Sequence, residues 1–319
     1  MMKKIAFILP LIAIALTSCS NNNSLIESKV FCFDTMVDSK LYEGNKENIK
    51  EVEKILNNIS NITDNYENKS TNGVYTINHT TDDVEVSETL YKLLEKAFNV
   101  SSVGATYFNP FCGSLSKKWK DALEKQQTLS ETVIYEELEK INSSSLSFLS
   151  QNTVKRSGDA EIDLGGIAKG YALDEVYSYL KENQISKYLI NAGSSSILLG
   201  EKNTNDGLFT VGLKDVKNAY IKAKNCFVST SSISEQGVTI NGVTYSHIIN
   251  PQNGSAINVN DGVIVISENG AYGDAMSTSL MNNTIDEIKE IEKEFDIKTI
   301  VIKKNQVAYS NSSLEVLYH

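Results

Sequence analysis

Two hydrophobic periodicities are mixed along this chain, and their order constrains the fold more than any other feature. Helical spacing of apolar residues predicts helices over residues 49–59, 90–98, 133–141 and 167–180. Strand spacing predicts strands over residues 188–190, 197–199, 208–213, 226–229, 262–266, 298–302 and 307–309. Because helices and strands do not alternate strictly, an α+β fold with mixed or antiparallel sheets is favoured over a doubly wound parallel sheet.

Local signals mark where several of these elements begin or turn. Ser87 and Ser130 each precede a predicted helix, as N-cap residues do. Asn241-Gly242 tolerates the positive dihedrals of a tight turn and predicts a hairpin over residues 238–245. The serine-rich stretch 143–150 also carries alternating apolar residues, which predicts an edge strand rather than a linker. With no linker or repeat after residue 24, we expect a single compact domain.

Composition limits the class of protein and its partners. Hydrophobic residues make up 41% of the 319 residues and charged residues 22%, which is enough apolar material for a sizeable core. The net charge at pH 7 is −10, so a long phosphate backbone would be repelled, and we predict no nucleic-acid partner. A small anionic ligand remains compatible, because a metal ion or a few backbone amides overcome the global charge locally.

The N-terminus is typical of a targeting segment. Lys3 and Lys4 precede an apolar run over residues 5–16, and Leu16-Thr17-Ser18-Cys19 follows as a lipobox. The run is shorter than the roughly 20 residues of a spanning helix. An ordinary secretory signal with an incidental cysteine is the alternative. We expect a lipoprotein held by lipid on the extracytoplasmic side of a bacterial membrane, with a signal peptide over residues 1–18, lipidation at Cys19, a tether over 19–28 and a domain over 29–319.

The remaining cysteines do not form a disulfide framework. Cys32, Cys112 and Cys226 are odd in number and far apart, so we predict that they are small buried hydrophobic residues. They have no cysteine or histidine neighbour at zinc-ligand spacing, and the histidines lie apart at positions 79, 247 and 319.

Paired glycines open the predicted helix at residues 167–180. The segment from Asp163 to Asp174 reads DLGGIAKGYALD. A helix start offers free N–H groups and a positive dipole end, and glycine lets a phosphate or ribose approach the backbone closely. A tight strand-to-helix turn without a ligand is the alternative, and the spacing matches neither the Walker nor the Rossmann fingerprint.

Asp274 and Thr278 lie four residues apart in the segment 271–280, so a helix would place them on one face. Carboxylate and hydroxyl oxygens are ligands for a hard cation such as Mg²⁺. Alternatively, Asp274 is a helix cap.

Two further segments are candidates for a site. His247 follows the predicted hairpin and leads into the turn at Asn250-Pro251, where it could exchange a proton or simply satisfy backbone carbonyls. The segment 191–196, Asn-Ala-Gly-Ser-Ser-Ser, could line a site or form a turn.

In order and spacing, these four segments resemble the ApbE family of FAD:protein FMN transferases. The family pattern runs DLGGIAKGYAVD, a small-residue loop after an asparagine, HIIDPxTG and a D-x-x-x-T helix. Phe108-Asn109-Pro110 is similar to the family's F-D-P-T segment, and Tyr66 with Ser70 is similar to its Y-x-x-x-S turn. The resemblance extends over nearly all of the chain after the signal peptide. It implies a single T-fold-like α+β domain with its flavin site between two α/β halves.

The resemblance also implies which residues form the site. The Gly166 carbonyl, Asp274 and Thr278 are expected to hold Mg²⁺ against the FAD pyrophosphate. The residues expected to contact FAD are Tyr66, Tyr107, Phe108, Asn109, Asp163, Lys169 and Ile248. Three positions depart from the family pattern, namely Phe33 in place of a frequent Met and Asn109 and Asn250 in place of Asp. Both asparagines keep an acceptor oxygen, so hydrogen bonding could survive there.

The implied reaction is the Mg²⁺-dependent transfer of the FMN moiety of FAD to a Thr or Ser hydroxyl of an extracytoplasmic flavoprotein, with release of AMP. FAD is then a substrate, Mg²⁺ is the cofactor, and His247 and Asp274 are the catalytic candidates. His247 would accept the proton of the target hydroxyl. Hydrolysis of FAD to FMN and AMP, or flavin binding without catalysis, are the alternatives.

Overall fold

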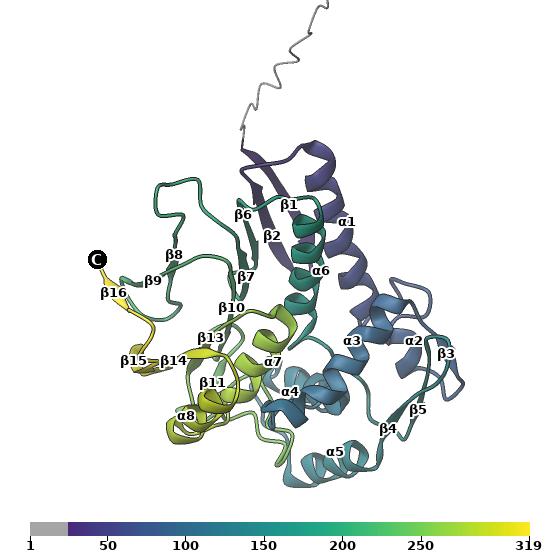
Figure 1. Ribbon diagram of the computed structural model, residues 1–319. Helices are drawn as coiled ribbons and strands as arrows, with labels where there is room; N and C mark the ends of the chain where they lie inside the picture. The colour runs from purple at the N-terminus through teal and green to yellow at the C-terminus, as the bar shows by residue number, and fades with distance from the viewer. Residues whose placement is uncertain (1–24) are drawn as a thin grey trace, which may run out of the picture.

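An eight-stranded antiparallel sheet is the centre of the protein, whose computed structural model describes residues 25–319 (Figure 1). Neighbouring strands follow the order β1-β2-β6-β7-β10-β13-β14-β15. The order is not sequential, so segments far apart in the chain meet in this sheet. Its strands are β1 (Ile26–Cys32), β2 (Thr35–Leu41), β6 (Tyr188–Ala192), β7 (Ser196–Leu199), β10 (Cys226–Ser232), β13 (Gly262–Ser267), β14 (Lys298–Lys303) and β15 (Gln306–Ser310).

Three smaller antiparallel sheets surround the main one. One has the order β16-β9-β8, with β8 (Phe209–Gly212), β9 (Ala219–Ala223) and β16 (Leu317–Tyr318). A second has the order β3-β5-β4, with β3 (Val84–Glu85), β4 (Ser145–Phe148) and β5 (Thr153–Ser157). The third is the hairpin of β11 (Val238–Ile240) and β12 (Val243–Tyr245). The predicted hairpin and edge strand are therefore confirmed, and Asn241 and Gly242 have the positive φ angles of a tight turn, 51° and 82°.

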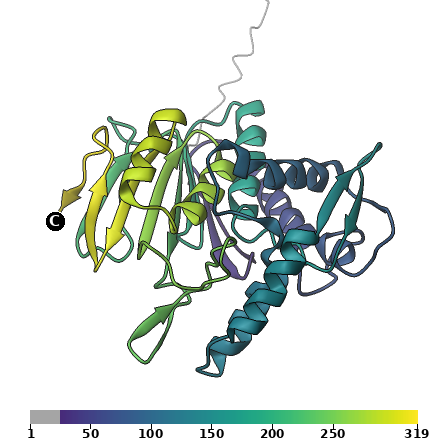
Figure 2. The same cartoon turned by 90° about the horizontal axis from the view of Figure 1, so that it is seen from below.

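The helices gather on one side of the main sheet, where α6 packs between α1 and α7 and α7 covers β10 and β13 (Figures 1 and 2). The predicted caps are observed, since Ser87 accepts a hydrogen bond from Leu90 N–H and Ser130 accepts one from Val133 N–H. The helices are α1 (Lys46–Thr63), α2 (Val74–Asn78), α3 (Glu88–Asn99), α4 (Gly113–Glu124), α5 (Glu131–Ser143), α6 (Ala168–Glu182), α7 (Gly270–Leu280) and α8 (Ile285–Glu294), with 3₁₀ turns η1 (Val100–Val103) and η2 (Pro110–Cys112).

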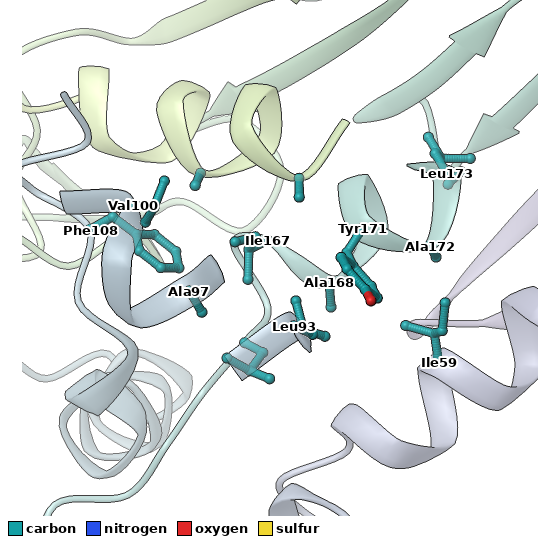
Figure 3. Packing of buried hydrophobic residues seen from close by; sticks show 14 of the residues in the cluster. Ile59, Leu93, Ala97, Val100, Phe108, Ile167, Ala168, Tyr171, Ala172 and Leu173 are labelled. Carbon is teal, nitrogen blue, oxygen red and sulfur yellow. The ribbon is translucent and has the colours of Figure 1, made fainter. Parts of the chain in front are cut away.

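Two apolar clusters cover the two faces of the main sheet. The larger cluster lies under the helices and contains Ile59, Leu93 and Ile167 (Figure 3). The smaller cluster lies between the main sheet and the sheet of β8, β9 and β16, and it contains Phe209 and Val228. Successive side chains of a strand point to opposite faces of the sheet, so neighbouring residues of one strand belong to different clusters. The α+β prediction with antiparallel sheets packed by helices is confirmed.

Two glycines let α6 and α7 cross at very close range. A Cβ atom at Gly170 would overlap the Gly270 carbonyl oxygen, and a Cβ atom at Gly270 would overlap the Gly170 carbonyl oxygen. Because only glycine permits this approach, Gly170 of the glycine segment and Gly270, the residue before the segment 271–280, fix how the two segments meet.

The described residues begin downstream of the predicted lipidation site. The signal peptide and Cys19 lie outside the described residues, and the predicted end of the tether at residue 28 falls within β1. Within residues 25–319, no helix has the length and apolar character of a membrane span. Cys32 is a buried free thiol, as predicted, and burial raises its pKa to about 11. Cys112 and Cys226 are free but only half-buried.

Candidate functional site

A cavity of about 490 Å³ brings the four sequence motifs together. It lies where the turns that leave β1, β6 and β10 approach the crossing of α6 and α7. Its wall includes nearly all of the residues predicted for the site: Tyr107, Phe108, Asn109, Asp163, Gly166, Lys169, His247, Ile248, Asp274 and Thr278.

Tyr66 is the exception. It lines an adjoining cavity of about 400 Å³, which shares Asp163 and Lys169 with the first. Tyr66 is 49% exposed, and the ammonium groups of Lys117 and Lys120 lie 4.8 and 5.1 Å from the centre of its ring. A contact between Tyr66 and a ligand thus requires the ligand to extend from the main cavity into the adjoining one.

The oxygen-rich end of the cavity is formed by Gly166, Asp274 and Thr278. Asp274 and Thr278 lie one turn apart on α7, and a Cβ atom at Gly166 would lie 3.1 Å from Thr278 Oγ1. Asp274 is only 4% exposed, and no ion pair within residues 25–319 involves it. A buried carboxylate without a cationic partner, beside hydroxyl and carbonyl oxygens, fits a magnesium ion. The described residues contain no cluster of three or more His, Cys, Asp or Glu side chains that would bind a metal without backbone or hydroxyl ligands.

Asp274 also caps a helix, although not its own. Its Oδ2 accepts a hydrogen bond of 2.9 Å from Gly170 N–H in the first turn of α6, and its Oδ1 accepts one of 3.0 Å from Ser196 Oγ. The cap of α7 is Asn269, whose Oδ1 accepts from Tyr272 N–H at 2.8 Å. The carboxylate is therefore held in place by two donors before any ligand binds.

Asp174 makes the reciprocal contact. Its carboxylate accepts hydrogen bonds from Gly270 N–H and Ala271 N–H at 2.6 and 2.9 Å, at the start of α7. Each helix thus supplies a carboxylate to the N-terminus of the other, where the helix dipole favours a negative charge. Burial raises the pKa of Asp174 to about 6 despite these donors.

The glycine segment forms a tight turn and also faces the cavity. Asp163 Oδ1 accepts a hydrogen bond of 2.8 Å from Gly165 N–H, and burial raises the pKa of Asp163 above its usual range. Lys169 follows in the first turn of α6 and lines the same wall. The segment is therefore both a tight strand-to-helix turn and a candidate for ligand binding, because the turn directs the N-terminus of α6 toward the cavity.

His247 projects into the cavity after the β11–β12 hairpin. Its pKa lies below the usual 6.5 because surrounding protein disfavours the imidazolium, while nearby Glu235 partly opposes this effect. Among the described residues, the imidazole of His79 makes a hydrogen bond to the Tyr75 carbonyl, whereas the imidazole of His247 makes none. His247 is thus not occupied in satisfying a backbone carbonyl.

The three departures from the family pattern have local structural roles. Phe33 and Asp34 form the turn between β1 and β2 with positive φ angles of 53° and 54°, and both line the cavity. Asn109 caps the η2 turn by accepting from Phe111 N–H at 2.9 Å. Asn250 accepts from Gln252 N–H at 2.9 Å and so shapes the Pro251 turn. Each asparagine accepts a hydrogen bond that an aspartate carboxylate at the same position could also accept.

The cavity wall also includes the candidate segment 191–196 and several residues that no sequence motif indicated. The segment 191–196 is a turn, and it also supplies Ser195 to the wall and Ser196 to Asp274. Lys214 and Glu235 line the cavity and form an ion pair of 2.7 Å. They lie in loops outside any motif, so no local signal identifies them. Thr230 and Ser231 also line the cavity, and the run of hydroxyl side chains at the end of β10 is the sequence feature that could have indicated them.

The fold and the cavity define a class of protein: an α+β protein with a site in which a helix N-terminus, a lysine, and carboxylate and hydroxyl oxygens meet apolar and aromatic walls. Such a site suits a ligand with both phosphate and ring groups.

Comparisons with known proteins agree with this class. An FAD:protein FMN transferase of Klebsiella pneumoniae (strain 342) is 30% identical over 260 residues, which are 75% of this chain and 77% of that protein. The ApbE protein of Thermotoga maritima has a TM-score of 0.77 at 23% identity, over 91% of this chain and 98% of that one. The flavin transferase ApbE from Vibrio cholerae has a TM-score of 0.74 at 18% identity over the same shares. The sequence profile of the ApbE family matches residues 33–301. The chain therefore belongs to the ApbE family, which confirms the resemblance of its motifs.

Proposed function

We propose that this chain transfers the FMN moiety of FAD to a Thr or Ser hydroxyl of an extracytoplasmic protein and requires Mg²⁺ to do so. Family membership makes the chain an enzyme of the FAD:protein FMN transferase class. The observation that carries the finer proposal is the buried carboxylate of Asp274, which forms no ion pair within residues 25–319 and lines the cavity beside Thr278.

The cavity supports a division of roles along the FAD molecule. The pyrophosphate would lie at the oxygen-rich end, where the Lys169 ammonium and the positive end of the α6 dipole meet it. Phe33, Tyr107, Phe108 and Ile248 offer apolar surface for the rings. When bound by Gly166, Asp274 and Thr278, Mg²⁺ would neutralise charge that develops on the phosphate oxygens.

The transfer needs a proton acceptor, and His247 is suited to the task. The acceptor hydroxyl attacks the FMN phosphorus, a P–O bond forms, and the bond from that phosphorus to the oxygen of the AMP phosphate breaks. The hydroxyl proton passes to His247, and AMP leaves with the bridging oxygen. Because its pKa is lowered, His247 is the free base at neutral pH and is ready to accept the proton.

The targeting segment supports a location outside the cytoplasm. The lipobox ending at Cys19 and the apolar run before it are consistent with a chain anchored to a bacterial membrane by lipid. The acceptor is then a flavoprotein of the same compartment, in which a phosphoester bond prevents loss of the flavin.

Incubation of residues 20–319 with FAD, Mg²⁺ and a purified extracytoplasmic flavoprotein in its flavin-free form tests the proposal. Mass analysis is expected to show the acceptor heavier by one FMN, minus water, and an equal amount of AMP. Chelation of the metal should abolish both products. FMN and AMP free in solution, with an unmodified acceptor, would instead indicate a hydrolase, and intact FAD would indicate a binding protein.

A further inference from the structure

A second cavity, on the face of the main sheet opposite the helices, has no role in the transfer chemistry. Its volume is about 590 Å³. Leu189 on β6 and Ile197 on β7 form its floor, and both are only partly buried. Strand β8 forms one side. We call this space the β8 groove, defined by Leu189, Ile197 and residues 209–212.

Strand β8 presents an open backbone edge to this groove. It pairs with β9, and no second strand pairs with it within residues 25–319. Leu213 N–H donates to Ala219 C=O at 2.9 Å, so the alternation of an antiparallel ladder turns the N–H and C=O of Thr210 and Gly212 away from β9. A Cβ atom at Gly212 would meet no atom within 4 Å, so the face of β8 that carries this position is not covered by other residues of the described chain.

The groove leads directly into the reaction cavity. Gly193, Lys214 and Thr230 line both spaces. They lie where β6, β8 and β10 end, whereas Leu189 and Phe209 lie at the far end of the groove. A peptide segment lying along β8 would therefore extend past Lys214 into the cavity that holds Asp274 and His247.

We propose that the β8 groove binds the acceptor protein as an extended segment, which adds to the edge of β8 and carries its Thr or Ser hydroxyl into the reaction cavity. This inference rests on the proposed function. Backbone groups of the segment pair with Thr210 and Gly212, and its alternate side chains contact Leu189, Ile197 and Val211. Backbone pairing supplies affinity, and contacts of the alternate side chains with these residues favour apolar residues at those positions.

The short edge favours an acceptor over a second copy of this chain. Only Thr210 and Gly212 offer outward backbone groups, and such limited pairing suits a partner that must leave after each turnover. A second copy bound there would also close the opening shared by the two cavities.

Substitution at Thr210 tests the role of the edge. Thr210→Pro removes an outward N–H without removing a bond to β9, because proline is tolerated in edge strands at such positions. Thr210→Ala is the matched control, since it keeps the N–H and changes only the side chain. A peptide library with a central threonine and randomised flanks, presented with FAD and Mg²⁺, serves as the acceptor. We expect Thr210→Pro to raise the KM for modified peptides about tenfold or more, as the loss of one hydrogen bond would, while FAD affinity stays unchanged.

Hydrogen exchange gives an independent readout. The amide protons of Thr210 and Gly212 should exchange rapidly in the free enzyme and become protected when a modified peptide is added. If Thr210→Pro does not fold, as judged by its thermal unfolding, Ile197→Glu replaces it, with Ile197→Val as control.

The outcomes separate this inference from the proposed function. If the parental enzyme modifies a folded flavoprotein but no peptide, or if both groove variants keep the parental KM, the groove does not bind an extended acceptor. Protection of the β8 amides that depends on enzyme concentration alone would indicate a second copy and overturn the inference. If the parental enzyme modifies neither peptide nor protein, the proposed function fails.

Discussion

Replacement of Asp274 is expected to damage both stability and catalysis, and the two effects can be separated. Asp274→Ala removes the acceptor of Gly170 N–H in the first turn of α6 and of Ser196 Oγ, both of which are buried. Hydrogen bonds to a charged group contribute about 1.5 to 3 kcal/mol each. Because water can replace the carboxylate as acceptor in part, we expect the loss of both bonds to lower the free energy of unfolding by roughly 2 to 4 kcal/mol. Asp274→Asn keeps one acceptor oxygen and should lose about half as much.

Catalysis should respond differently to the same two variants. Neither Ala nor Asn supplies the negative charge that a magnesium shell needs, so both are expected to lose FMN transfer. Ser196→Ala is the matched control. It removes one hydrogen bond to Asp274 but no charge, and it should cost about 1 to 2 kcal/mol of stability while transfer falls less than about tenfold.

Urea unfolding measures the stability of each variant, and flavin fluorescence on the acceptor after denaturing electrophoresis measures transfer. A magnesium titration of transfer completes the set. Transfer by Asp274→Asn at the parental rate, with the same Mg²⁺ requirement, would refute the metal role. Parental stability of Asp274→Ala would refute the capping role.

Four further predictions concern His247, Asp174 and Cys19. His247→Ala should still bind FAD but transfer FMN at least about a hundredfold more slowly, because general-base catalysis typically contributes about 10² to 10⁴-fold; a loss under tenfold would leave His247 a structural role. The acid limb of the parental pH–rate profile should lie below pH 6.5, since the surrounding protein disfavours the imidazolium and so lowers the pKa of His247, and a limb above 6.5 would contradict this. Asp174 has a folded-state pKa of about 6, above its usual 3.8, so between these pH values the folded protein holds a proton that the unfolded chain has lost. The free energy of unfolding should therefore fall as the pH rises from about 4 to 6. Urea unfolding of Asp174→Asn should lack this dependence on pH. Cys19→Ala should no longer fractionate with membranes, and continued retention in high salt, which screens surface attraction, would place the anchor elsewhere.

Much of the site could be predicted because its motifs carry local requirements. The glycine segment must turn tightly at Gly165 and approach another helix at Gly170, and both needs are written in a few neighbouring residues. Asp274 and Thr278 share a face because of helical spacing alone. Tyr66 was placed in the same site as the others, but its position depends on how the α1–α2 connection packs, which no local pattern encodes.

The sequence by itself determined the helix caps at Ser87 and Ser130, the turn at Asn241-Gly242, the α+β class and the four motifs, because each follows from interactions between residues close in the chain. Only the tertiary structure decided how distant segments meet. The reciprocal capping by Asp174 and Asp274 requires α6 and α7 to cross, although the two carboxylates are far apart in sequence.

The open edge of β8 and its path into the reaction cavity likewise depend on strand order. Alternation of apolar residues tells which face of a strand is buried but not which strand lies beside it. Strand β6 pairs with β2, and β7 with β10, only because burial of the whole sheet under the helices selects that order over others with the same local pattern. Long-range packing, not local preference, therefore set the geometry of the site.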